Sequence, residues 1–311
     1  MSNLAKLWFV GLVFLGAGCG ERTRVQGEPV TQAPTKFTRW TETGKTEGSF
    51  DTAIVRYVDK KGRRVDLMGA VHIGDSTYYD VLQKRFEAYE SVLYELVAPK
   101  GTRPQRGRKG GGVVSMLQRG LKSALDLDFQ LDAIDYSPKN FVHADLSPVE
   151  FMKRMEASGD SMLKIMLRAM LVAAQRQKDG KGSKVTMGHI LLGLLSKNRA
   201  HYFKFLFAQE LDEIEAMLAA FGGKKGERSV IIGERNAAAF SVLDEQLHAG
   251  KEKLAIFYGA AHLPDMETRL LARGFRRTEL EWVTAWDVTV PAKQSGGGGE
   301  PPSPKKEAVH R

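Results

Sequence analysis

The stretch VDLMGAVH at residues 65–72 has a counterpart in LAIFYGAAH at residues 254–262. Both are apolar runs of strand character that end in Gly-x-x-His, and the four motif residues are Gly69, His72, Gly259 and His262. Glycine near the end of a strand lets another backbone or a ligand approach closely. Open α/β folds bind their ligands at the carboxyl ends of strands. The pairing therefore predicts a site at the end of a sheet, built from strands that are far apart in the sequence.

Two further apolar runs end in charged residues. The run SVLY at residues 91–94 precedes Glu95, and the run SVIIG at residues 229–233 precedes Glu234 and Arg235. A single buried His or Glu is commonly a hydrogen-bonded structural residue. Four strand-like runs that end in such residues instead indicate one shared site, so we expect both runs to be strands that lead to it.

These motifs together resemble the TraB/PrgY/GumN family of the Tiki superfamily. The resemblance rests on the paired Gly-x-x-His motifs, on Glu95, on the Glu-Arg-Asn step at residues 234–236 and on FVHADLSP at residues 141–148. It covers roughly residues 50–285 and is weakest in the middle helical stretch. The resemblance implies a metal-dependent protease that uses its Gly-x-x-His histidines. The superfamily also contains a haem-binding lipoprotein and a peptide-pheromone shutdown protein.

The residue types at the strand ends suit a metal site. Two neutral imidazoles and a carboxylate form a common ligand set, so His72, Glu95 and His262 are the candidate ligands of a divalent ion. Open coordination positions on such an ion allow a bound water to be activated. Arg235 has a fixed planar charge that can hold a carboxylate or an oxyanion, and either Glu95 or Glu234 can serve as general base.

The identity of the metal and the use of the cleft both stay open at this point. The His-Glu-x-x-His motif of ordinary zinc proteases is absent, so manganese, cobalt and zinc all remain candidates. We expect His143 and Asp145, which share one predicted loop, to support a metal ligand from outside through hydrogen bonds. The alternative function is a non-catalytic lipoprotein that captures haem or a signal peptide in the same cleft. No Gly-x-Ser-x-Gly elbow is present, which argues against a Ser-His-Asp hydrolase.

The order of apolar patterns predicts an α/β (α+β) fold within residues 46–290. Two β-α-β halves form one central sheet, and a long helical insertion at about residues 113–225 separates them. The predicted strands are 52–58, 63–71, 91–97, 229–233, 253–258 and 278–290, and the predicted helices outside the insertion are 75–90, 237–248 and 263–272. The tail at residues 291–311 contains GGGGEPPSP and is predicted to be disordered.

The insertion shows apolar residues at helical spacing and is rich in methionine. Its predicted helices are 152–157, 161–177, 187–195 and 199–221. A face that carries several methionines is ordinarily core filler or a lid. A groove for a cofactor or a partner is the alternative interpretation.

The first residues of the chain are typical of a bacterial lipoprotein signal. Lys6 precedes twelve uncharged residues, 7–18, which are too few for a spanning helix of about 20 residues but have the length of a signal-peptide core. The run ends in LGAGC, and Cys19 is the only cysteine in the chain. We therefore expect a signal peptide at residues 1–18, lipid attachment at Cys19 and a flexible tether at residues 19–45. The predicted location is the cell envelope, lipid-anchored and extracytoplasmic, on the periplasmic face or the cell surface.

The chain is basic, with a net charge of +9 and a pI of about 9.5. The basic runs at residues 100–109 and 222–228 contain no interleaved aromatic residues, which platforms for nucleic acid use. Solvated loops explain them better, and attraction to an anionic membrane could also account for the charge. The expected partners are thus a peptide or small-molecule ligand and the membrane reached through the N-terminal lipid, and no nucleic acid.

Overall fold

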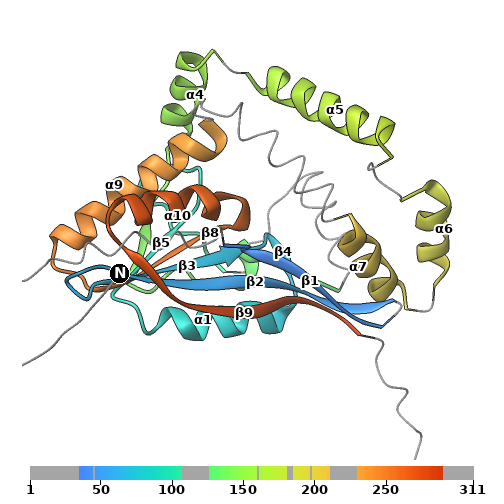
Figure 1. Cartoon of the computed structure of the whole chain (residues 1–311), viewed down its shortest axis with the longest axis horizontal. Helices are drawn as coiled ribbons and strands as arrows, with labels where there is room; N and C mark the ends of the chain where they lie inside the picture. The colour runs from blue at the N-terminus through green and yellow to red at the C-terminus, as the bar shows by residue number, and fades with distance from the viewer. Residues whose placement is uncertain are drawn as a thin grey trace, which may run out of the picture. The chain divides into compact units, whose positions relative to one another are not determined.

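The computed structural model describes residues 35–44, 46–106, 126–159, 161–180, 185–196, 198–210 and 230–289. They form a seven-stranded mixed sheet of order β1-β2-β3-β8-β5-β7, with β9 paired to β2 (Figure 1). Its strands are β1 (Thr38–Gly44), β2 (Glu47–Val58), β3 (Arg64–Ala70), β5 (Ser91–Tyr94), β7 (Phe141–His143), β8 (Lys253–Gly259) and β9 (Arg276–Val288). A second, two-stranded sheet pairs β4 (Ile73–Gly74) with β6 (Asp128–Phe129). The predicted α/β class is confirmed.

Four neighbouring strands of the large sheet, β3, β8, β5 and β7, run parallel. In the β3–β8 pairing, Ala70 lies opposite Gly259, so the two Gly-x-x-His motifs are neighbours in space with a one-residue offset. In the next pairings Tyr94 lies opposite both Phe257 and His143. The carboxyl ends of all four strands therefore meet at one edge of the sheet, which we call the carboxyl edge.

Helices cover both faces of the parallel strands. On one face lie α9 (Arg235–His248) and α10 (Leu263–Ala272), and on the other lies α1 (Ser76–Phe86) (Figure 1). The sequence of strand β8 reflects this coverage. Residues 254–258, LAIFY, form a continuous apolar run in which every residue is buried. Strands that are covered on both faces need such runs rather than alternation.

The domain begins earlier in the chain than predicted. We predicted a flexible tether to residue 45, and this is wrong for the described residues 35–44. Strand β1 pairs with β2 along the sheet, and Phe37 is buried in the core. Thr35 also bonds to Glu267 of α10 at 2.5 Å and 3.1 Å. The predicted signal peptide, Cys19, the rest of the predicted tether and the tail at 291–311 lie outside the described residues.

The insertion between the two halves is mostly helical, as predicted, but it also supplies strands. Its helices are α3 (Gln130–Ala133), α4 (Pro148–Ala157), α5 (Met162–Lys178), α6 (Met187–Leu195) and α7 (Arg199–Gln209). Strands β6 and β7 also fall inside it, and β7, which was not predicted, extends the parallel sheet. Residues 107–125 and 211–229 lie outside the described part. None of the described helices is both long and apolar enough to cross a membrane.

The apolar run before Glu234 is not a strand. Residues Val230–Glu234 form a π-helical turn, η1, that continues directly into α9. Strands β3 and β5 occupy both sides of β8, and Ile231 packs against Met155 and Ile165 instead of a strand. The prediction of a fourth strand end was therefore wrong, because the partly buried Ile231 packs against residues of helices α4 and α5.

Candidate active site at the carboxyl edge

Four charged or titratable side chains meet at the carboxyl edge, and we call them the arginine cluster. They are Glu95 after β5, Asp145 after β7, Arg235 at the start of α9 and His262 at the end of the short helix η2 (Ala260–His262). Strands β5, β7 and β8 stop at this edge, and Glu95, Asp145 and His262 follow their ends. The register of the sheet therefore brings together residues up to 167 positions apart (262 − 95).

Arg235 lies at the centre and holds both carboxylates. Its Nη2 donates to Glu95 Oε1 at 2.7 Å and to Asp145 Oδ2 at 2.5 Å, and its Nε donates to Asp145 Oδ1 at 3.0 Å. The exposed fractions of the side chains are 11% for Arg235, 10% for Glu95 and 0% for Asp145. Buried charges of this kind persist only when they are paired and hydrogen-bonded. The guanidinium is thus locked in one orientation by two carboxylates.

Glu95 is also bound by the backbone of the second motif. Gly259 N–H donates to Glu95 Oε2 at 2.7 Å. Burial by itself would raise the pKa of Glu95, but the charges of His262 and Arg235 and this N–H outweigh it and lower the pKa to about 2. Glu95 is therefore ionised at neutral pH. A Cβ at position 259 would lie 3.2 Å from Oε2, which explains why the motif has glycine there.

His262 is buried and held in a single tautomer. Its Nδ1 lies 2.7 Å from Asn236 Oδ1, and Asn236 Nδ2 donates to the His262 carbonyl at 3.1 Å and to Asp265 Oδ2 at 2.7 Å. Because both of those partners accept, the amide oxygen must face the ring, and Nδ1 carries the hydrogen. Burial lowers the pKa of His262, which is therefore neutral near pH 7. Its Nε2 lone pair accepts a hydrogen bond from Arg235 Nη1 at 3.5 Å and lies 3.6 Å from Glu95 Oε1.

His72, at the end of neighbouring strand β3, is held in a similar way but is exposed. Its Nδ1 lies 3.1 Å from Oε1 of the buried Gln130, whose Nε2 donates to Tyr136 at 3.0 Å. With the amide in this orientation, Nδ1 donates and Nε2 keeps its lone pair. His72 also acts electrostatically on both Glu95 and His262. Both motif histidines thus use a carboxamide to keep the hydrogen on Nδ1 and the lone pair on Nε2.

The predicted metal ligands are only partly assembled. His262 Nε2 and Glu95 Oε1 are 3.6 Å apart, a separation that suits two ligands of one divalent ion with bonds of about 2.0–2.2 Å. His72 does not join them, because the described residues contain no group of three His, Cys, Asp or Glu side chains arranged to hold an ion. The donor chemistry fits a metal, and its third ligand would have to come from the exposed His72 ring.

Three other predicted site residues have different surroundings. Asp145 belongs to the arginine cluster, where it bonds Arg235 and does not support a histidine. Its expected partner His143 instead accepts from Gly101 N–H at 3.3 Å and donates to the Leu96 carbonyl at 2.6 Å, so it holds the segment after β5. Glu234 pairs with Arg154 of α4 at 2.5 Å. The side chains that hydrogen-bond the candidate metal-binding histidines are therefore Asn236 and Gln130, not the predicted His143 and Asp145.

The residues that fix the two imidazoles had no assigned role in the sequence. Asn236 appeared only as the last residue of the Glu-Arg-Asn step, where its chemistry was not considered. Asp265 and Gln130 gave no signal, because single polar residues on helices are common. Tyr258 also gave no signal, because it lies buried within an apolar strand. Its hydroxyl donates to the Ala144 carbonyl, and its ring centre lies 5.3 Å from that of His262.

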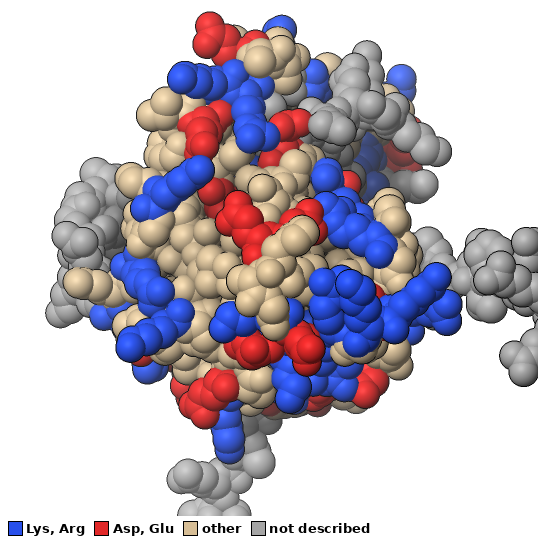
Figure 2. Space-filling model, turned by 90° about the vertical axis from the view of Figure 1, so that its left-hand side faces the viewer, with Lys and Arg blue, Asp and Glu red and all other residues tan. Residues whose placement is uncertain are grey.

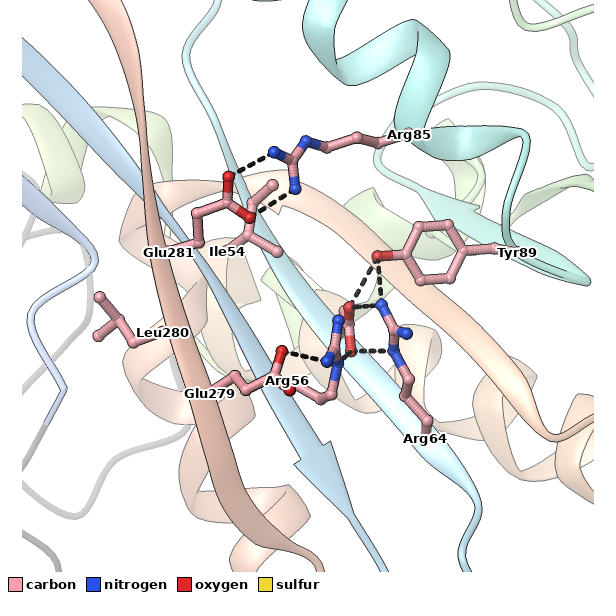
Figure 3. Close-up of a pocket in the computed structure, with 9 residues that line it drawn as sticks. Ile54, Arg56, Arg64, Arg85, Tyr89, Glu279, Leu280 and Glu281 are labelled. Carbon is pink, nitrogen blue, oxygen red and sulfur yellow. Dashed lines mark hydrogen bonds and ion pairs between the residues drawn. The ribbon is translucent and has the colours of Figure 1, made fainter.

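A second polar pocket lies between β2, β9 and the end of α1 and has a volume of about 280 Å³ (Figure 3). Three guanidinium groups there face three carboxylates, so its formal charge is zero. These groups are Arg56, Arg64, Arg85, Asp66, Glu279 and Glu281. Asp66 is fully buried and also accepts from Tyr89 at 2.7 Å. We interpret this pocket as an ion-pair network that ties β2, β3, β9 and α1 together.

Charges of both signs also share the face of the molecule in Figure 2. Lys and Arg side chains there are interspersed with Asp and Glu and with uncharged surface. The excess positive charge of the chain is thus offset locally on this face by neighbouring carboxylates.

In comparisons with known proteins, no family model matches the chain and no curated protein matches it. The resemblance to the TraB/PrgY/GumN family therefore stays a prediction from the motifs. Function is argued below from the geometry of the site, since fold alone does not determine it.

Proposed function

We propose that the protein is a metal-dependent hydrolase that cleaves peptides, as its resemblance to the TraB/PrgY/GumN family implies. The observation that carries the proposal is the hydrogen-bond pattern that His72 and His262 share. Each donates Nδ1–H to a carboxamide oxygen and keeps an Nε2 lone pair at the carboxyl edge. A hydrogen bond from the other ring nitrogen is typical of histidines that bind metals.

The residues that would hold the ion are His262, Glu95 and, from the neighbouring strand, His72. When bound, a divalent ion would polarise a carbonyl and activate a water molecule. Nitrogen and oxygen ligands suit manganese, cobalt and zinc, so the donor set does not select one of them.

The protein groups around the ion have separate tasks. Asp145 and Glu95 fix the Arg235 guanidinium through Nε and Nη2, and its Nη1 donates to His262 Nε2 at 3.5 Å. Arg235 Nη1 is the donor that would turn to an oxygen of the substrate when His262 Nε2 binds the ion. Glu95 is ionised at neutral pH, with a pKa of about 2 and with both oxygens bonded to Arg235 and to Gly259 N–H, and Glu234 is paired with Arg154. Each of these two carboxylates would have to leave its partner to accept a proton.

Metal analysis of the purified full chain tests the proposal. We expect one divalent ion per chain, and we expect His262→Ala and His72→Ala each to abolish its binding. His248→Ala is the matched control, because His248 is exposed at the end of α9 and bonds only the Asp244 carbonyl. The proposal fails if both motif variants keep full metal occupancy.

Digestion of a peptide library with and without a chelator then tests catalysis. Cleavage that the chelator stops, and that metal restores, supports a hydrolase. The alternative is a haem- or peptide-binding lipoprotein. It would show no cleavage, with visible haem absorption in the wild type that is lost in His262→Ala.

We also propose that Cys19 carries the lipid that holds this domain at the extracytoplasmic side of the cell envelope. More than one acyl chain is needed for firm attachment. Palmitate labelling and membrane fractionation of the wild type and Cys19→Ala test this. Equal membrane association without label in either protein would refute lipidation.

A further inference from the structure

Helix α5 carries an apolar stripe that faces solvent. Successive members are three residues and one residue apart in turn. Each therefore lies three or four positions from another member, which places them on one face of the helix. They are Leu163, Met166, Leu167, Met170, Leu171 and Ala174. The five large side chains are between 48% and 70% exposed. A helix face in contact with water is normally polar, so this stripe indicates a partner.

The stripe is not the side by which α5 packs on its own domain. Ile165 and Ala169, on the opposite face, are 4% and 5% exposed. Ile165 forms a small cluster with Met155 of α4 and Ile231 of η1. Helix α5 thus already has a buried inner face, and its outer face is available to something else.

The next helix, α6, is even more apolar. Its sequence MGHILLGLL contains no Asp, Glu, Lys or Arg. It packs on α7 through Gly193, where a Cβ would lie only 2.7 Å from the Phe203 ring. Its exposed side chains are Ile190, Leu191, Leu192, Leu194 and Leu195, and the last of these is 84% exposed.

Positive charge flanks these apolar residues. Lys164 and Arg168 follow one edge of the α5 stripe, and Lys178 lies at the end of the helix. No acidic residue lies within α5. The cores of protein interfaces are depleted in lysine. An apolar stripe bordered by Lys and Arg is instead typical of a helix that lies in the plane of an anionic membrane surface.

We propose that the outer faces of α5 and α6 form a membrane-binding surface that enters the headgroup region of an anionic phospholipid bilayer (Figure 1). Neither helix is long and apolar enough to span the bilayer, so both lie along its surface. The cluster of Ile165, Met155 and Ile231 connects the inner face of α5 to η1, which leads directly into Arg235. This contact with lipid is separate from any lipid on Cys19 and does not depend on the reaction at the arginine cluster.

Site-specific fluorescence tests the proposal in the full chain. Cys19 is the only cysteine, so a Cys19→Ser background removes lipidation and leaves one engineered thiol to label. An environment-sensitive dye at Met170→Cys should shift to the blue when phosphatidylglycerol/phosphatidylethanolamine vesicles are added. The same dye at Leu271→Cys is the control, because Leu271 is 42% exposed on α10. The absence of a shift at position 170, or equal shifts at both, would overturn the proposal.

Vesicle sedimentation in the same background gives the second measurement. Leu167→Glu/Leu171→Glu should weaken binding to these vesicles about tenfold or more, since apolar burial and charge attraction both decrease. Leu271→Glu/Leu280→Glu adds the same charge at comparably exposed sites outside the insertion and should bind as the parent does. All variants keep residues 1–34, so the difference reports on the helices, and circular dichroism checks their folding.

Two results of these experiments would overturn the proposal. Unchanged vesicle binding together with a dimer that Leu167→Glu/Leu171→Glu dissociates would identify the surface as a contact between two copies of the chain. Equal binding to phosphatidylcholine vesicles would overturn the requirement for anionic lipid. Weaker binding to phosphatidylcholine, and weaker binding to anionic vesicles at high salt, would support it.

Discussion

The two Gly-x-x-His motifs lie on neighbouring strands and yet end in different environments. His262 is 5% exposed, beside Arg235 and Glu95, whereas His72 is exposed. After His262 the chain continues directly into α10, which packs on the sheet. After His72 it enters the two-residue strand β4, which pairs with β6 outside the main sheet. The motif thus determines a position at the carboxyl edge, and the segment after it determines burial.

The largest effect should come from removing Arg235, whose charge is paired with the buried carboxylates beside His262. Arg235→Ala leaves Glu95 and Asp145 buried without their counter-charge, which should lower the free energy of unfolding by about 3–5 kcal/mol. Arg154→Ala is the control, because its pair with Glu234 is partly exposed and should be worth about 1 kcal/mol or less. Urea denaturation compares them, and equal losses would contradict the central role of Arg235.

The second largest effect should come from acid, which should lower the free energy of unfolding through Glu95 and His262. The pKa of Glu95 is lowered from 4.5 to about 2, so its contribution is present above pH 4.5 and disappears as the pH falls toward 2. A shift of this size corresponds to about 3 kcal/mol. The lowered pKa of His262 acts in the same direction, with a loss that begins as the pH falls below its ordinary value of 6.5. Unfolding free energies of the wild type and Glu95→Gln across pH 2–7 check this, and parallel curves would contradict it.

A smaller effect should follow from removing the carboxamide that holds each imidazole. Asn236→Ala should cost about 1–3 kcal/mol, because it removes the hydrogen bonds that the Asn236 carboxamide makes to Nδ1 and to the carbonyl of His262. It should also release the Nδ1–H tautomer of His262, which nitrogen NMR of the ring detects. Gln130→Ala should change the tautomer of His72 only. An unchanged His262 spectrum in Asn236→Ala would show that the tautomer is held by something else.

The smallest effect on stability should come from a substitution of His72, the exposed motif histidine. His72→Ala should change the free energy of unfolding by no more than about 0.5 kcal/mol, as for most exposed positions. The same variant should lose the metal if the proposed function holds, so binding and folding would be separated at one residue. Thermal unfolding and metal content of one preparation measure both, and a large loss of stability would show that His72 has a structural role.

Local patterns were sufficient for most of the secondary structure. The runs before His72, Glu95 and His262 are strands, and α9 and α10 follow their predicted ranges closely. Apolar periodicity does not distinguish a strand from a buried helical turn in a short run, which is why residues 230–234 were assigned wrongly. The short strand β7 was missed because three residues carry no detectable period.

For this chain, the sequence by itself determined the α/β class, the strands before His72, Glu95 and His262, and four residues that meet at the carboxyl edge, because residue order and apolar runs are local properties. Only the tertiary structure decided that Arg235 binds both Glu95 and Asp145, that Asn236 and Gln130 orient the histidines, and that His143 and Glu234 lie apart. These outcomes depend on sheet register and helix packing. Both arise from contacts between residues far apart in the chain, which no local pattern specifies.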